Sequence, residues 1–136
     1  MSTRPNSKGV NAKGRSIRTK SFAGVPRAVM EAEDYIKLPS ASKCLLFEFA
    51  YQYRGHNNGD LTAAYTILKK RGWRSPTTLS HALKRLLAAN LAVCTRQGQF
   101  HNPGGVCALY ALTWLPIHEC KGKHDAVPSS IPLRRF

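Results

Sequence analysis

Cationic and hydrogen-bonding side chains recur along one stretch of this chain at spacings that suit contact with a polyanion. Between residues 76 and 90 the apolar positions follow helical spacing: Leu79, Ala82, Leu83, Leu86 and Leu87. The opposite side of such a helix carries Arg74, Thr77, His81, Lys84 and Arg85. Arg and Lys pair with guanine edges, and Thr methyl groups contact thymine. We expect this helix to enter the major groove of double-stranded DNA; the alternative is an ordinary solvated helix face.

Two flanking segments extend this constellation. Lys69, Lys70 and Arg71 end the preceding helix, where they are expected to grip the phosphate backbone. Arg96 and Gln97 stand at the base of a glycine-rich hairpin tip, and Arg96 is the expected contact of this wing. The full set of expected DNA contacts is Lys69, Lys70, Arg71, Arg74, Ser75, Thr77, Thr78, His81, Lys84, Arg85, Arg96 and Gln97.

Residue types that serve catalysis or metal binding are sparse. His118, Glu119, Cys120 and His124 could ligate zinc, but their spacing matches no standard structural set and a fourth ligand is missing nearby. The sequence has no phosphate-binding loop or dinucleotide fingerprint. Nuclease chemistry would need two or three grouped acids, whereas Asp60 stands alone. We therefore expect no enzymatic activity, no cofactor and no metal site.

The charge balance points to a polyanionic partner. The 136 residues include 21 Lys and Arg against 7 Asp and Glu, a formal charge of +14. No carboxylate occurs from Leu61 to His118, so that stretch presents nothing that repels phosphate. No apolar run approaches the ~18 residues of a membrane span, and the N-terminus has no hydrophobic signal segment. We expect a cytoplasmic protein that does not bind membranes.

The elements that must position these residues form one domain, residues 24–119, between a basic mobile arm at 1–23 and a flexible tail at 120–136. Four helices are expected to begin at Pro26, at Ser40 or Ser42, at Asp60 or Thr62, and at Ser75. The second of these is apolar nearly all round, Phe47 and Tyr51 included, so it is expected at the centre of the bundle. Strand-like runs at 91–96 and 106–114 then form a β-hairpin. The predicted fold class is α+β: a winged helix of three to four helices with a C-terminal hairpin wing.

Several stretches also resemble a known family. They are Gly55-His-Asn-Asn-Gly-Asp-Leu, Leu68-Lys-Lys-Arg-Gly-Trp-Arg-Ser, Thr78-Leu, Ala82-Leu-Lys-Arg-Leu-Leu and Leu109-Tyr-Ala-Leu-Thr-Trp-Leu-Pro-Ile. Together they resemble winged helix-turn-helix proteins of proteobacterial prophages, plasmids and integrative elements, over about residues 25–120. The resemblance implies a DNA-binding role in transcriptional regulation or replication of a mobile genetic element. It implies no catalytic residue.

Two other functions remain open besides double-stranded DNA binding. The basic face could dock on a host nucleoprotein complex, as in a mobile-element protein that inhibits a defence complex. It could also bind structured RNA, although the aromatic platform typical of single-strand readers is absent. Charge alone does not separate these, because any polyanion is attracted to such a surface. A monomer and a homodimer are both compatible with the sequence.

Overall fold

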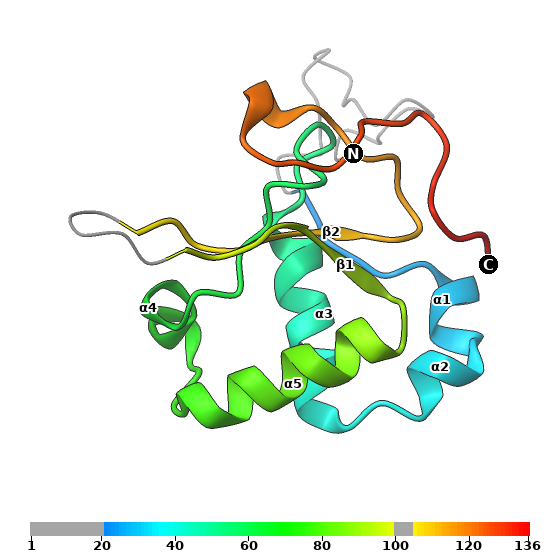
Figure 1. Ribbon diagram of the computed structural model, residues 1–136. Helices are drawn as coiled ribbons and strands as arrows, with labels where there is room; N and C mark the ends of the chain where they lie inside the picture. Colours follow the sequence, from blue (N-terminus) through cyan, green and yellow to red (C-terminus); the bar gives the residue numbers. More distant parts are fainter. Residues whose placement is uncertain (1–20, 100–104) are drawn as a thin grey trace, which may run out of the picture.

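The protein is a mixed α+β structure in a computed structural model that describes residues 21–99 and 105–136 (Figure 1). Its elements are α1 (Arg27–Glu31), α2 (Glu33–Ile36), α3 (Ser40–Gln52), α4 (Tyr65–Leu68), the 3-10 turn η1 (Lys69–Arg71), α5 (Pro76–Ala88), β1 (Ala92–Arg96), β2 (Leu109–Leu112) and the 3-10 turn η2 (Cys120–Gly122). The predicted arm lies outside the described residues up to residue 20, as does the hairpin tip at 100–104.

The core lies where α3 crosses α5 beneath the hairpin (Figure 1). Leu45, Leu46 and Phe49 of α3 are fully buried, as is Leu86 of α5. The Phe49 ring stacks on Tyr110 of β2, with 5.6 Å between ring centroids. Removing these large apolar side chains from water is the main stabilising term, and it fixes α5 against the rest of the fold.

The sheet forms the layer on the other side of this core. β1 and β2 pair antiparallel, with Ala92 opposite Leu112. On the free edge of β2, Leu61 forms a bridge to Tyr110 through backbone hydrogen bonds of 3.1 and 2.8 Å. The chain therefore runs from α3 to this edge residue, then to α4, α5 and the hairpin. That order is compatible with the predicted winged helix.

The start of α5 is formed as the sequence predicts. Gly72 ends the preceding turn at a φ of 102°, a left-handed conformation that glycine adopts without a Cβ penalty. Ser75 is the N-cap, and its hydroxyl oxygen accepts a 3.2 Å hydrogen bond from the backbone N–H of Thr78. Pro76 takes the first helical position, where its missing N–H costs nothing.

Two other helix starts also fall where the sequence predicts them, because Pro26 is the N-cap of α1 and α3 begins at Ser40, but their details differ. The first helix is broken at Ala32, whose ψ of 143° is extended, so α1 and α2 are separate. Pro39 precedes α3, and the Ser42 hydroxyl donates to the Ala82 carbonyl of α5 at 3.0 Å instead of capping its own helix. This bond ties α3 to α5 and satisfies a fully buried hydroxyl.

The α4 segment also differs from prediction. The helix begins only at Tyr65, with no side-chain cap from Asp60 or Thr62. Thr62 instead accepts a hydrogen bond from Ala64 in a local turn, at 3.1 Å. Leu68 is fully buried, whereas its neighbour Ile67 is 49% exposed. A helix of one turn cannot bury both sides.

Helix α3 is less enclosed than its composition predicts. Phe47 and Tyr51 are 39% and 44% exposed, on the side turned away from Leu46 and Phe49. The prediction treated every apolar residue as core, but a domain of this size has no layer left to cover the outer face of α3. That face instead carries Glu48 and Tyr51, which contact η1.

Asn58 anchors the loop after α3. It is fully buried, and its amide donates to the carbonyls of Leu112, Leu115 and Pro116 at 2.9–3.2 Å. Its side-chain oxygen accepts from the Leu112 N–H at 2.8 Å, and its own N–H donates to His118 Nδ1 at 3.1 Å. A single polar side chain thus satisfies the backbone where β2 ends.

The C-terminal segment, predicted as a flexible tail, is folded back over the domain (orange to red in Figure 1). Arg134 donates to the carbonyls of Ala89 and Asn90 at 2.9 and 3.2 Å, and it forms an ion pair with Asp34 of α2. His124 is buried, with Nε2 bonded to the His118 carbonyl at 2.6 Å. Pro128, Pro132 and the paired serines suggested a loose tail. The segment is held to the domain by hydrogen bonds to backbone carbonyls, by the Arg134–Asp34 ion pair and by the contact of Phe136 with Trp114.

Candidate nucleic-acid interface

Helix α5 presents its predicted contact residues to solvent on the side opposite its core stripe. Leu79, Ala82 and Leu86 are buried. The exposed residues are Arg74, Thr77, Thr78, His81, Lys84 and Arg85. Figure 1 shows that α5 lies on the far side of the hairpin from the C-terminal segment, so the tail does not cover this face. These side chains are therefore accessible to a large ligand.

Ser75, which was expected to contact DNA, instead caps helix α5. It is half-buried, and its hydroxyl oxygen is occupied by the Thr78 N–H as the helix cap. Its role is to fix where α5 starts, and hence where Arg74 and Thr77 point. The side chain of Thr78 itself is exposed.

The basic turn η1 combines two unpaired lysines with one restrained arginine. Lys69 and Lys70 are exposed and belong to none of the ion pairs found within residues 21–99 and 105–136. Arg71 donates through Nε to Glu48 at 2.5 Å, and its guanidinium carbon lies 3.7 Å from the centroid of the Tyr51 ring. The hydrogen bond to Glu48 raises the pKa of Arg71 further above its already high value.

The carboxylates of the described residues lie mostly away from this face. Glu31 and Glu33 belong to α1 and α2, whereas Asp34 of α2 lines a hollow beside Lys84 and Arg85 of α5 and is paired with Arg134. Asp60 is paired with Lys123 at 3.1 Å, in the layer formed by the tail. Glu48 is the carboxylate nearest to the basic turn, and Arg71 and Trp73 occupy it. The α5 face thus keeps a positive potential that can attract phosphates.

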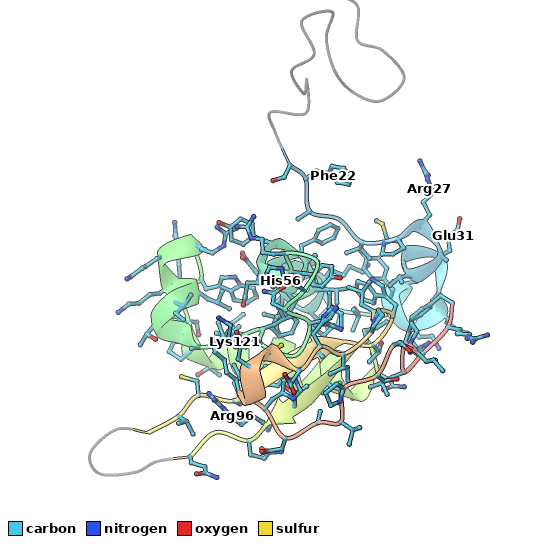
Figure 2. The ribbon with its side chains drawn as sticks, turned by 90° about the horizontal axis from the view of Figure 1, so that it is seen from above. Phe22, Arg27, Glu31, His56, Arg96 and Lys121 are labelled. Carbon is cyan, nitrogen blue, oxygen red and sulfur yellow. The ribbon has the colours of Figure 1, made fainter. Side chains whose placement is uncertain are left out.

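Arg96, the expected DNA contact of the wing, is bonded to other parts of the fold. Arg96 donates from Nε and Nη2 to the Cys107 carbonyl at 3.0 and 2.6 Å, and from Nη1 to the Lys123 carbonyl at 3.1 Å. Figure 2 shows Arg96 beside the turn that carries Lys121. Three of its five N–H donors are therefore engaged in joining the hairpin to the C-terminal segment. Gln97 is exposed, and the tip beyond Gln99 lies outside the described residues.

Two of the four potential zinc ligands, His118 and His124, form hydrogen bonds within the fold. The Asn58 N–H donates to His118 Nδ1, and His124 bonds the His118 carbonyl. The Cys120 thiol lies 3.9 Å from the Asn58 carbonyl oxygen, and burial raises its pKa. Within residues 21–99 and 105–136 no group of three or more His, Cys, Asp or Glu side chains could hold a metal ion.

Glu48 and Tyr51 were not predicted to belong to this surface. Both lie on the outer face of α3, one turn apart, and they meet the basic turn that precedes α5. A signal was present: Glu48 is the sole carboxylate in a helix that is otherwise apolar or uncharged apart from Lys43. A lone acid in such a helix needs a cationic partner, and η1 supplies one.

Comparison with protein families, with curated proteins and with solved structures found no match for this chain. Across the described parts of the chain, the helices are all too short or too polar to cross a bilayer.

Proposed function

We propose that this chain is a cytoplasmic winged-helix protein that binds double-stranded DNA, with α5 in the major groove. The observation that carries the proposal is the α5 face, where Arg74, Thr77, His81 and Lys84 are exposed side by side with no carboxylate among them. Helices with such a surface fit the ~12 Å major groove. The bridge of Leu61 to β2 favours the winged-helix assignment, because it adds a third strand position ahead of α4.

Individual residues take distinct roles in this proposal. Lys69 and Lys70 contact the phosphate backbone and set the position of the protein, while the middle of α5 faces the bases. Arg96, three of whose N–H donors are engaged, serves as a fixed positive charge at the base of the wing, and Gln97 is free to reach the backbone. The protein acts as a monomer or homodimer without a cofactor. In the setting that the family resemblance implies, it regulates transcription or replication of a mobile genetic element.

The test is fluorescence anisotropy of the purified protein with labelled duplex DNA and duplex RNA between ~50 and 300 mM salt. About five or six phosphate contacts predict a log–log slope near −5 for duplex DNA. Tighter binding to duplex RNA than to DNA at every salt concentration would favour the structured-RNA function instead. Absence of binding to either duplex at low salt would refute the proposal, and would leave docking on a nucleoprotein complex as the function to pursue by pull-down.

A further inference from the structure

Arg71 is the most restrained cation on the proposed DNA-binding side. Its Nε donates to Glu48 Oε1, and its guanidinium stacks on the Tyr51 ring at 3.7 Å. The Glu48 side chain is only 15% exposed, and its second oxygen accepts a 3.3 Å hydrogen bond from Trp73 Nε1. The carboxylate is thus held in place on both oxygens, and it holds Arg71 in turn.

The restraint leaves one edge of the guanidinium unused. A guanidinium has five N–H donors in a rigid planar fork. Glu48 takes the Nε donor, whereas Nη1 and Nη2 make no hydrogen bond to any described residue. The Arg71 side chain is 38% exposed, so this edge is open to solvent. Two parallel N–H groups of this kind match the two oxygens of a phosphate group.

We propose that Glu48 and Tyr51 are positioning residues that hold Arg71 ready to grip one phosphate of the nucleic-acid backbone. This inference rests on the proposed function. An unrestrained arginine side chain loses rotamer freedom when it binds a phosphate, and this loss costs free energy. The Arg71 side chain is already restricted in the folded protein, so its binding costs less. Glu48 therefore promotes binding to a polyanion although it is itself an anion, because it fixes the cation beside it.

Counting charges alone predicts that removal of the Glu48 carboxylate strengthens binding to DNA, whereas our proposal predicts that it weakens binding. An experiment can therefore distinguish the two. Glu48→Ala and Glu31→Ala each remove one negative charge, and Glu31 is exposed on α1, away from the basic turn (Figure 2). We would measure anisotropy with a 20-bp duplex for both variants, for Glu48→Gln and for Tyr51→Leu. Each change would also be made in an Arg71→Ala background, and thermal unfolding would confirm that every variant is folded.

We expect Glu31→Ala to bind slightly more tightly than the unmodified protein. Glu48→Ala and Tyr51→Leu should each weaken binding by about threefold to tenfold, the cost of ordering one long side chain. Glu48→Gln retains an acceptor for Nε and should restore most of the loss. In the Arg71→Ala background neither Glu48→Ala nor Tyr51→Leu should weaken binding further.

Two results would overturn the inference while leaving the proposed function intact. One is tighter binding by Glu48→Ala, equal to or beyond that of Glu31→Ala, because Glu48 would then merely compete with phosphate for Arg71. The other is an equal loss with and without Arg71, because the effect would then not pass through the guanidinium. If the unmodified protein binds no duplex at low salt, the proposed function fails and this inference fails with it.

Discussion

Replacing Arg134 tests whether the C-terminal segment belongs to the folded domain. The side chain is 22% exposed and donates to two carbonyls at the end of α5, Ala89 and Asn90. It also pairs with Asp34, whose side chain is 50% exposed. In Arg134→Met the aliphatic bulk is kept, but these polar contacts are lost together.

The magnitude follows from the exposure of each partner. Each carbonyl bond from a guanidinium in this setting contributes about 1 kcal/mol, and the solvent-screened pair with Asp34 adds at most about 0.5 kcal/mol. We expect a loss of about 2–3 kcal/mol in the free energy of unfolding, or a fall of roughly 6–9 °C in the melting temperature.

Urea denaturation monitored by tryptophan fluorescence would measure the change. Trp114 is a suitable reporter because its ring packs edge-on against Phe136, with the centroids 6.5 Å apart. The matched control is Arg135→Met, which removes the same charge from an exposed neighbour and should cost less than about 0.5 kcal/mol. Equal stability of the two variants would refute the reasoning, since the segment would then behave as the flexible tail that composition suggested.

Three further predictions concern residues that shape the site. Ser75→Ala should destabilise the protein by about 1 kcal/mol through the lost helix cap, whereas Ser80→Ala on the exposed side of α5 should not; denaturation midpoints give the comparison. Asn58→Leu should cost more than about 3 kcal/mol, because it leaves buried backbone groups near Leu112 unpaired, and near-native stability would contradict that role. Burial raises the pKa of the Cys94 thiol, so at pH 8 it should be alkylated more slowly than exposed Cys44; mass spectrometry of a timed iodoacetamide reaction measures this, and equal rates would count against the described burial.

The parts of the fold that follow local rules were predictable from the sequence. The Ser-Pro start of α5, its leucine stripe and the glycine that ends η1 each depend on neighbouring residues alone, and all three are present. The hairpin followed from the switch in apolar period after Asn90. The exposure of the basic face of α5 followed as well, because the leucine stripe dictates which side is buried.

Features that depend on distant partners were not predictable. Ser42 is a plausible cap in isolation, yet it bonds Ala82, 40 residues away. Arg96 resembles a free wing cation, but the carbonyl of Lys123 reaches it only because the C-terminal segment folds back. Arg71 is likewise restrained by a carboxylate from α3. Each of these polar side chains finds its partner through tertiary packing, which apolar periodicity does not encode.

The most direct test of the central claim compares two variants with equal charge loss. Arg74→Gln/Lys84→Gln removes two cations from the α5 face, and Arg27→Gln/Lys121→Asn removes two from sites away from it, both labelled in Figure 2. If α5 binds duplex DNA, anisotropy at ~100 mM salt should show at least a tenfold weaker affinity for the first variant than for the second, since one lost base contact alone costs ~1–3 kcal/mol. Equal weakening would contradict the account, because binding would then depend on total charge and not on α5.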